Sequence, residues 1–295
     1  MPEPILESDG LVKHYRHFWS GREVRAVDGI SLQVQPGVAF GLLGPNGSGK
    51  TTFVKLLLTA VRPTAGHARL FGRDARNPEA RRAVGYLPEN HRFPTYNTGF
   101  QMLEFYSALS GTPAAERRRR AGELLELVGL AQWADVRIGK YSKGMLQRLG
   151  LAQAMMHRPA LLILDEPSDG VDPVGRRHIR EILAGLRREG TTIFLNSHLL
   201  SEVELFCDEV AIISKGKVAV AGKLADLTAG TGYQVSAATA NNGLVNLHAP
   251  DRAALNAAID RLRAEGAEID SVTRVRSTLE DVFVRTVEQP SEEAR

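Results

Sequence analysis

Residues 44–51 read Gly44-Pro45-Asn46-Gly47-Ser48-Gly49-Lys50-Thr51. This stretch has the pattern Gly-x-x-x-x-Gly-Lys-[Ser/Thr], which is typical of a loop that wraps a nucleotide triphosphate. Its glycines let the backbone approach the phosphates, while successive N–H groups form an anion-binding nest at the start of a helix. We expect Lys50 to reach the β- and γ-phosphates and the Thr51 hydroxyl to bind Mg²⁺, with the rest of the loop and Thr52 also contacting the nucleotide.

The segments on either side of the loop fit this assignment. Residues 38–43 form a short apolar run that is typical of a buried strand, and residues 51–58 form a mostly apolar helical pattern. The alternative is a glycine-rich turn that carries Lys-Thr by chance, and the strand–loop–helix order argues against it. The loop by itself indicates only nucleotide binding, because many unrelated enzymes use it.

The bulk composition restricts the class of protein. The 37 Lys+Arg residues nearly balance the 34 Asp+Glu residues, and the formal net charge of +3 argues against a dedicated nucleic-acid binder. The single cysteine, Cys207, has no partner for a disulfide within the chain, which fits a reducing compartment. No stretch approaches the ~18 apolar residues of a membrane helix, and no secretory signal is visible. We therefore expect a soluble, cytoplasmic protein without direct nucleic-acid contacts.

Strand-like and helix-like segments alternate along most of the chain. The first forty residues hold short β-like runs with Asp9-Gly10 and Asp28-Gly29 between them, which are hairpin-type turn signals. After the phosphate loop, strand-like segments recur with helical patterns between them, at residues 68–71, 83–87, 161–164, 192–195 and 210–213. This order predicts an α/β fold with a largely parallel sheet.

Residues 90–158 depart from this alternation. They hold helical patterns at residues 100–109 and 114–128 and no convincing strand. We therefore expect a helical subdomain inserted into the sheet-bearing core.

The end of the chain is expected to form a unit of its own. The main domain is predicted to cover residues 1–222, and residues 223–289 to form a small α+β domain. The last helix of this domain is predicted to open with a capping box between Ser277 and Glu280. Residues 290–295 are polar and predicted to be disordered.

A second chemical motif lies where an aliphatic run ends in two acids, Leu161-Leu162-Ile163-Leu164-Asp165-Glu166. Ligands of open α/β sheets bind at the carboxyl ends of the strands, so this run delivers carboxylates to the expected nucleotide site. We expect Asp165 to hold Mg²⁺ through water and Glu166 to be the general base that activates the attacking water. The alternative for this motif alone is a strand followed by an acidic helix start.

His198 ends a further strand-like run, Thr192-Ile193-Phe194-Leu195-Asn196-Ser197-His198. A lone histidine is more often structural than catalytic. Here its position at a strand end matches that of Asp165, so we expect the imidazole to contact the γ-phosphate and the attacking water.

Taken together, these motifs resemble the ATP-binding cassette of ABC transporters over roughly residues 5–222. The most discriminating element is the segment Tyr141-Ser142-Lys143-Gly144-Met145-Leu146-Gln147-Arg148, which resembles the Leu-Ser-Gly-Gly-Gln signature of that family. The resemblance implies nucleotide contacts by Ser142, Lys143, Gly144 and Met145. Ser168-Asp169-Gly170-Val171-Asp172-Pro173 resembles the family's D-loop, which adds Asp172 to the candidate contacts, and His198 matches the switch histidine.

Two further positions are assigned from the resemblance. Tyr15 lies where the family stacks an aromatic ring on adenine, with a packing role as the alternative because Phe18 and Trp19 lie close by. Glu89 stands where the family usually has a loop glutamine. A carboxylate there can still reach Mg²⁺ or water, although it adds negative charge beside the γ-phosphate, so Glu89 is a candidate Mg²⁺ ligand.

The resemblance also implies a fold class. It is the α/β P-loop NTPase cassette, with a mixed, mostly parallel core sheet, an N-terminal antiparallel β subdomain and a helical subdomain, here followed by the small α+β C-terminal domain. The Tyr-Ser-Lys-Gly-Met form of the signature and the segment 278–283 resemble the single-cassette ATPases of bacterial exporters.

Such ATPases imply particular partners and cofactors. Two copies would form a homodimer around two ATP molecules with Mg²⁺, and would drive a separate multi-span transmembrane permease from the cytoplasmic face of the inner membrane. Import is disfavoured by the signature form and by the C-terminal unit but stays open. Two roles without solute transport also stay open. One is a cassette that powers a membrane complex mechanically, in motility or envelope assembly, and the second is a non-transport ABC ATPase that acts on ribosomes or DNA.

Two surface segments bear on such a partner, whose groove is expected between the sheet core and the helical insert. Residues 91–96 mix aromatic and turn residues as a coupling surface does, with ordinary loop packing as the alternative. The run Arg117-Arg118-Arg119-Arg120 is interpreted as a solvated helix face in preference to a membrane-surface patch.

Overall fold

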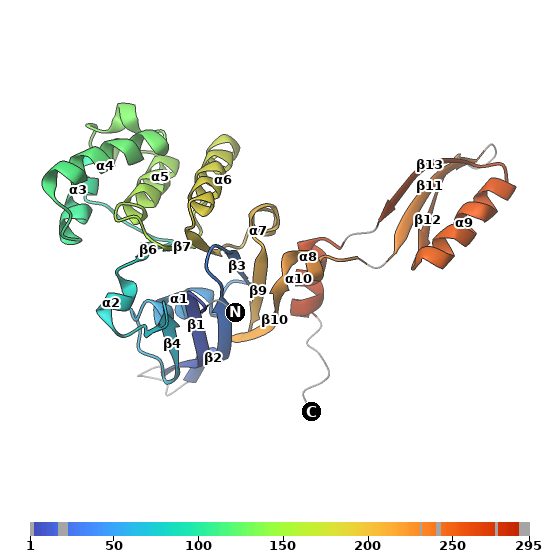
Figure 1. Cartoon of the computed structure of the whole chain (residues 1–295), viewed down its shortest axis with the longest axis horizontal. Helices are drawn as coiled ribbons and strands as arrows, with labels where there is room; N and C mark the ends of the chain where they lie inside the picture. Colours follow the sequence, from blue (N-terminus) through green and yellow to red (C-terminus); the bar gives the residue numbers. More distant parts are fainter. Residues whose placement is uncertain (1–2, 17–22, 231, 240–242, 275–276, 289–295) are drawn as a thin grey trace. The chain divides into compact units, whose positions relative to one another are not determined.

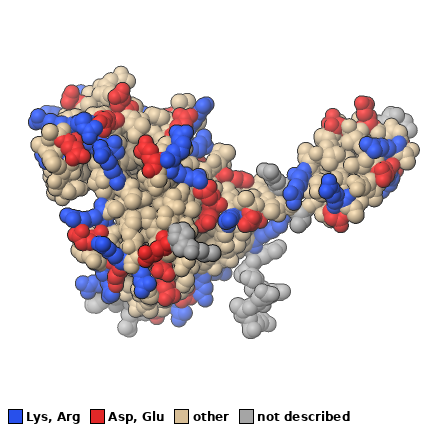
Figure 2. Space-filling model, viewed as in Figure 1, with Lys and Arg blue, Asp and Glu red and all other residues tan. Residues whose placement is uncertain are grey.

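The computed structural model describes residues 3–16, 23–230, 232–239, 243–274 and 277–288. The chain divides into two compact units, Met1–Gly222 and Lys223–Arg295, which are described separately below (Figure 1). Over the first unit, acidic and basic side chains are interspersed on the face drawn in Figure 2, in line with the nearly balanced charge. Within the described ranges, no helix combines the length and the apolar character that crossing a bilayer requires.

A six-stranded sheet forms the centre of the first unit. Its strands are β3 (Ala39–Leu43), β6 (Val84–Leu87), β7 (Leu161–Asp165), β8 (Thr192–Asn196), β9 (Glu209–Ser214) and β10 (Lys217–Lys223), in the order β10-β9-β3-β8-β7-β6. The pairs from β9 through β3, β8 and β7 to β6 are parallel. Every residue of β3, β7 and β8 is buried, because central parallel strands are covered on both faces and need continuous apolar runs. The predicted α/β class with a mostly parallel core sheet is confirmed.

A four-stranded antiparallel sheet lies beside this core. It consists of β1 (Leu6–Arg16), β2 (Glu23–Val34), β4 (Ala65–Leu70) and β5 (Arg73–Asp74), in the order β2-β1-β4-β5. Its apolar residues, among them Leu6, Val27 and Ile30, are buried in one cluster with residues of β3 and of the following helix. The predicted N-terminal antiparallel subdomain is thus present.

The expected hairpin turns at Asp9-Gly10 and Asp28-Gly29 are wrong, because both pairs lie inside long strands. The β1–β2 register shifts between Ser8 and Leu11 and again between Leu11 and Val12. Gly10 and Gly29 have left-handed φ angles of 54° and 79° at these shifts. A glycine in this conformation can add an extra residue to one strand as a β-bulge, which bends the strand without reversing the chain.

The first unit also contains helices. They are α1 (Lys50–Leu57), α2 (Pro78–Arg81), α3 (Gly99–Leu109), α4 (Ala114–Leu127), α5 (Lys143–Ala154), α6 (Pro173–Arg188) and α7 (Leu200–Phe206). The patterns at residues 100–109 and 114–128 are confirmed as α3 and α4, which lie with α5 between β6 and β7 in the sequence and group together in space (Figure 1). Two short 3-10 helices, Ala131–Trp133 and Ile138–Lys140, join α4 to α5.

The sequence did not predict α5. This helix contains Gly144 and Gly150, and glycine lowers helix propensity. A Cβ on Gly150 would lie 2.6 Å from Leu87 Cδ1 and 2.8 Å from His91 Nε2, so the missing side chain lets α5 approach the end of β6. The Ser142 side chain accepts a hydrogen bond from the Met145 N–H at 3.3 Å and thereby caps the helix.

The second unit is a small α+β fold. It contains α8 (Leu224–Leu227), β11 (Tyr233–Thr239), β12 (Gly243–Ala249), α9 (Arg252–Ala264), β13 (Glu268–Arg274) and α10 (Leu279–Glu288). The antiparallel sheet has the order β12-β11-β13, and α9 packs on it through Leu255 and Leu262, which meet Val235 and Ala237. The tail expected at residues 290–295 lies outside the described residues.

The cap of the last helix differs from the prediction by one residue. The Thr278 hydroxyl accepts from the Asp281 N–H at 3.1 Å, and an Asp281 carboxylate oxygen accepts from the Thr278 N–H at 2.8 Å. The capping box is therefore formed by Thr278 and Asp281, and the predicted pair of Ser277 and Glu280 is wrong.

Candidate active site

A cleft of about 530 Å³ lies at the carboxyl ends of the central parallel strands. Its lining includes residues 46–52 after β3, Glu89 after β6, Asp165 and Glu166 at the end of β7, and His198 after β8. Loops that are separate in the sequence meet here because parallel strands end at the same edge of the sheet. The structure thus brings together the predicted phosphate loop, both acids, the loop carboxylate and the histidine.

The Lys50 ammonium is held by the backbone of its own loop. Nζ donates to the Gly44 oxygen at 2.7 Å and to the Pro45 oxygen at 3.3 Å. Burial lowers the pKa of Lys50, while Glu166, Asp165 and Glu89 raise it by their charges. The Lys50 cation is thus surrounded by acidic groups on the cleft side, and it is the group that can offset their repulsion of a phosphate.

The start of α1 is open to an anion. Its N-cap is Gly49, which makes no side-chain capping bond, and the first turn holds no acid. The first N–H groups of a helix have no partner within the helix, and the helix dipole favours negative charge there. Gly49 has φ 110°, and a Cβ there would lie 2.1 Å from the Ala26 oxygen, so only glycine fits. The loop therefore offers the donors that a polyphosphate needs.

Asp165 presents one free carboxylate oxygen to the cleft. The residue is 1% exposed, its Oδ1 accepts from Asn196 Nδ2, and its Oδ2 has no hydrogen-bond partner among the described residues. Burial raises the pKa of Asp165 to about 6, with smaller additions from Glu89 and Glu166 that Asn196 and Lys50 oppose. A buried unpaired oxygen is costly unless a ligand satisfies it. A hard, oxygen-seeking cation such as Mg²⁺ fits this position.

Glu166 and His198 form a close pair. Glu166 Oε2 lies 2.7 Å from His198 Nδ1, and the Ser197 hydroxyl lies 3.4 Å from the same oxygen. Burial raises the pKa of Glu166, and the hydrogen bond and charge of His198 oppose this rise. The Glu166 side chain is 10% exposed and that of His198 is 53% exposed, so the histidine covers the acid from the solvent side.

The signature residues lie away from this cleft. Ser142 caps α5, and Lys143 Nζ lies 2.8 Å from Asp169 Oδ2. Gly144 and Met145 follow in the first turn of the same helix, and none of these four side chains is among the described residues that line the cleft. Asp172 is also outside it and caps α6 by accepting from the Gly175 N–H at 2.9 Å.

Tyr15 is on β1 and is 40% exposed. The ammonium of Lys13 lies 5.1 Å from the centre of its ring. The ring is accessible from solvent, as a stacking role requires, but it is not part of the cleft lining. Phe18 and Trp19, which lie close by in the sequence, are outside the described residues.

Three residues line the cleft that the sequence did not nominate, namely Ala26, Asp169 and Asn196. Asn196 is paired with Asp165 in the β7–β8 register. The strand-end rule that identified Asp165 and His198 could have found it, because Asn196 ends β8 directly opposite Asp165. Ala26 contributes through its backbone oxygen beside Gly49, for which a sequence carries no signal.

Comparisons with known proteins agree with this geometry. The family model for "ABC transporter" matches residues 27–169. An uncharacterized ABC transporter ATP-binding protein of Synechocystis is 38% identical over 97% of this chain and 85% of its own length. The daunorubicin/doxorubicin resistance ATP-binding protein DrrA of Streptomyces peucetius is 33% identical over 99% of this chain and 95% of its own. The Nod factor export ATP-binding protein I of Ralstonia nicotianae is 39% identical over 75% and 67%, respectively.

Solved structures give the same result. A dimeric ATP-binding cassette in a post-hydrolysis state, bound to ADP and Pi, matches 74% of this chain and 98% of its own with a TM-score of 0.69; at 21% identity this likeness shows the fold. The ATP-binding subunit of an ABC transporter matches 76% and 91% with 29% identity and a TM-score of 0.68. The resemblance inferred from the motifs is confirmed: the chain belongs to the ABC transporter family, as a single-cassette ATP-binding subunit that hydrolyses ATP.

Proposed function

We propose that this subunit works as a homodimer closed around two ATP molecules and drives export through a separate transmembrane permease. The observation that carries the proposal is the separation of the two halves of the site within one chain. Lys50, Glu166 and His198 meet in the cleft, whereas the signature at the start of α5 does not line it. A two-fold dimer completes both sites from one interface, since each chain supplies its loop to one nucleotide and its signature to the other.

In this proposal the chain's groups divide the chemistry as follows. The loop N–H groups and Lys50 bind the phosphates, and Tyr15 stacks on the adenine. Thr51 and Asp165 would hold Mg²⁺, with Glu89 as a further candidate, and the bound ion would supply positive charge against the phosphates. Glu166 takes a proton from the attacking water, and His198 orients the Glu166 carboxylate. From the other chain, Ser142, Lys143, Gly144 and Met145 bind the γ-phosphate side, with Asp172 close by.

Replacing the general base tests this assignment. Glu166→Gln keeps the size of the side chain but cannot accept the proton, so hydrolysis is expected to fall by roughly 10²- to 10⁴-fold while ATP still binds. The variant is then expected to accumulate as an ATP-bound dimer, which size-exclusion chromatography with light scattering detects. Glu181→Gln is the matched control, because Glu181 is an exposed acid on α6 that pairs with Arg177. Hydrolysis at the wild-type rate by Glu166→Gln would refute the role of Glu166.

The direction of transport rests on likeness. The Tyr-Ser-Lys-Gly-Met form of the signature is similar to that of exporter ATPases, and one relative carries the word export in its name. We infer an export role at the cytoplasmic face of the inner membrane, with residues 1–222 as the nucleotide-binding domain and 223–289 as a separate C-terminal domain. A purely mechanical role in motility or envelope assembly uses the same motor. Reconstitution with the co-purified partner, followed by a transport assay in vesicles, separates the two.

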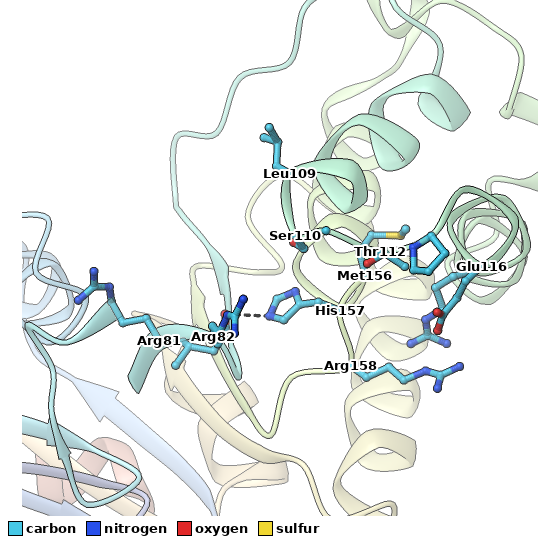
Figure 3. A pocket seen from close by; sticks show the side chains of 13 residues that line it. Arg81, Arg82, Leu109, Ser110, Thr112, Glu116, Met156, His157 and Arg158 are labelled. Carbon is cyan, nitrogen blue, oxygen red and sulfur yellow. Dashed lines mark hydrogen bonds between the residues drawn. The ribbon is translucent and has the colours of Figure 1, made fainter. Parts of the chain in front are cut away.

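A basic pocket supports a docking place for the permease. A cavity of about 760 Å³ lies between the end of α2, the start of β6 and the helical insert (Figure 3). Arg82 and Arg158 line it on either side of His157, whose Nε2 lies 3.0 Å from the Val84 oxygen. Arg81 and Arg120 add further positive charge, and Glu116 is the acid among the lining residues.

The charge of this pocket indicates the chemistry of its occupant. Arg158 makes no ion pair with the described residues, and its charge lowers the pKa of Arg120 in addition to the larger effect of burial, while Glu123 and Glu189 act in the opposite direction. A carboxylate from outside would relieve this repulsion. We infer that an acidic segment of the permease enters here, beside the 70% exposed side chain of Leu109.

The other two surface segments, residues 117–120 and 91–96, are less suited to bind the permease. Arg118 and Arg119 are exposed and pair with Glu104 and Glu123, as on a solvated helix face. Arg117 and Arg120 depart from that expectation because both are half-buried: Arg117 donates to the Thr112 oxygen, and Arg120 lines the basic pocket. Within residues 91–96, the His91 ring lies within 3.1 Å of the Pro88 and Leu146 oxygens, which is loop packing, whereas Tyr96 is 74% exposed.

A charge reversal tests the docking place. Arg158→Glu is expected to abolish co-purification of a multi-span protein from gently solubilised membranes and to leave the ATPase rate of the isolated chain unchanged. Arg188→Glu, an exposed arginine at the end of α6, is the control and should retain the partner. Retention of the partner by both variants would contradict the pocket assignment, and recovery of ribosomes or DNA in place of a membrane protein would contradict the transport role.

A further inference from the structure

The buried side chain of Gln147 reaches from α5 to the backbone of the general base. Gln147 is 4% exposed, and its Nε2 donates to the main-chain oxygen of Glu166 at 2.8 Å. The same oxygen accepts from the Asp169 N–H at 3.2 Å. One of the two donors that satisfy this carbonyl therefore comes from the helix that carries the signature at its start.

Glu166 needs such support because of its backbone conformation. Its φ is 53°, in the left-handed region that a residue with a bulky side chain rarely adopts. Its N–H donates to the Asn196 oxygen at 2.8 Å, so β8 holds one side of the residue and α5 holds the other. A conformation of this kind persists only where the surroundings hold it, and it sets the direction in which the carboxylate leaves the backbone. In this structure that direction leads to His198.

A second contact joins the same two segments. Lys143, the first residue of α5, forms its ion pair with Asp169, and Asp169 lines the cleft. The turn from Glu166 to Asp169 is thus attached to α5 both at the signature and about one helical turn further on. These two contacts give a shift of α5 a direct route to the backbone of Glu166.

We propose that Gln147 is a positioning residue whose amide fixes the backbone of Glu166 and links the signature end of α5 to the proton-accepting carboxylate. The proposal rests on the function proposed above, because there the signature binds the nucleotide held by the second copy. Engagement of α5 at one ATP site is then communicated, through Gln147, to the Glu166 that serves the other ATP site.

The positioning role is tested with Gln147→Met, which keeps the length of the side chain and removes the donor. Because misplacement of a reacting group by about 1 Å can cost roughly 10²-fold, kcat is expected to fall about ten- to hundredfold. The KM for ATP, and the ATP affinity measured in a Glu166→Gln background, should stay within about twofold. Gln153→Met is the matched control, since Gln153 lies on the same helix and its side chain makes no hydrogen bond with the described residues.

Two outcomes overturn the positioning role. One is an unchanged kcat in Gln147→Met, and the other is an equal loss of ATP affinity and kcat, which indicates general damage to the fold. A wild-type chain that fails to dimerise with ATP contradicts the proposed function instead, and the kcat comparison between Gln147→Met and Gln153→Met still decides the role of Gln147.

The link between the sites is tested in a tethered dimer whose second copy carries Glu166→Gln, so that only the first copy hydrolyses. Ser142→Ala in the first copy alters the signature that serves the non-hydrolysing site. Ser142→Ala is expected to slow the remaining hydrolysis severalfold when Gln147 is present and to have little further effect when Gln147→Met is present as well. The two substitutions then form a double-mutant cycle whose effects are not additive. Additive effects of the two substitutions overturn the link.

Discussion

Glu166 Oε2 lies 2.7 Å from Nδ1 of His198, and the two residues follow neighbouring parallel strands. In the mechanism proposed above Glu166 is the general base, and this pair offsets the effect of burial on its carboxylate. Burial alone raises the pKa of Glu166, and the hydrogen bond and charge of His198 oppose this effect. Since the Ser197 hydroxyl also points to the same oxygen, Oε2 is engaged by the two residues that follow β8, and the proposed mechanism assigns the attacking water to the other oxygen.

Removing the histidine should therefore impair chemistry and leave folding intact. We expect His198→Ala to lower the ATPase rate by roughly 10²-fold, because the carboxylate loses its orienting partner. The free energy of unfolding should change by less than about 0.5 kcal/mol, since the His198 side chain is 53% exposed. Steady-state ATPase assays and urea titrations measure the two quantities. His178→Ala on α6 is the control, and a wild-type rate in His198→Ala would contradict the assigned pair.

Asp165 should cost stability in return for metal binding. Its pKa is raised by burial from 3.8 to about 6, so the folded protein binds this proton more tightly than the unfolded chain. The proton bound to Asp165 therefore contributes its full stabilisation of the fold below about pH 4, and this contribution is lost as the pH rises through about 6. In EDTA without nucleotide, the free energy of unfolding of Asp165→Asn should rise relative to that of the wild type as the pH increases. The rise should amount to about 2–4 kcal/mol between about pH 4 and pH 7.5. Urea titrations across this range measure the difference; a constant difference would contradict the raised pKa.

Two glycines of the phosphate loop should respond differently to a methyl group. Gly49→Ala places a Cβ 2.1 Å from the Ala26 oxygen, whereas a Cβ on Gly47 meets no heavy atom within 4 Å. Both residues have left-handed φ angles, 110° and 79°, so both substitutions carry backbone strain of about 1–2 kcal/mol. Only Gly49→Ala must also move the loop, and we expect it to lose ATP binding while Gly47→Ala retains it. Titration with a fluorescent ATP analogue checks this, and equal losses would argue against a steric cause.

Glu89 should weaken phosphate binding and strengthen metal binding. Its charge is one of the contributions that raise the pKa of Asp165 and of Lys50, so its field reaches both groups. We expect Glu89→Gln to bind ATP about three- to tenfold more tightly in EDTA, because one repulsive charge is removed. The Mg²⁺ concentration for half-maximal activity should rise by a similar factor. Glu79→Gln on α2 is the control, and an unchanged Mg²⁺ requirement in Glu89→Gln would remove Glu89 from the ligand set.

The site could be predicted from the sequence where its residues follow local patterns. A glycine loop between an apolar run and a helix, and aliphatic runs that end in Asp165 or close to His198, each carry their own signal. The strand-end position of Asn196 is such a signal too, but its contact with Asp165, like the contact of Gln147 with Glu166, has none. Their roles depend on which strand lies beside β7 and on which side of α5 faces Glu166, and both are decided by the packing of segments that are distant in the sequence.

The wrong predictions, for the hairpin turns and for the cap of α10, also concern features that depend on packing between segments or on a choice between two registers. An Asp-Gly pair looks the same in sequence whether its glycine closes a hairpin or lies in a bulge. At Gly10 and Gly29 the pairing of β1 with β2 favours the bulge over the hairpin. The cap of α10 is a further case in which one sequence is compatible with two local structures. Ser277 and Thr278 both start a pattern with an acid three residues later, so the sequence offers two registers for one cap.

The choice between these registers can be measured. In the structure Thr278 exchanges hydrogen bonds with Asp281, and the Ser277 side chain makes none with the described residues. An N-cap threonine replaced by alanine costs about 1 kcal/mol, so Thr278→Ala should speed hydrogen exchange in α10 by roughly fivefold. Ser277→Ala should leave it unchanged. Because α10 begins with the fully buried Leu279, fraying of its first turn should also expose that side chain. If Ser277→Ala had the larger effect, the register of the cap would be the one expected from the sequence.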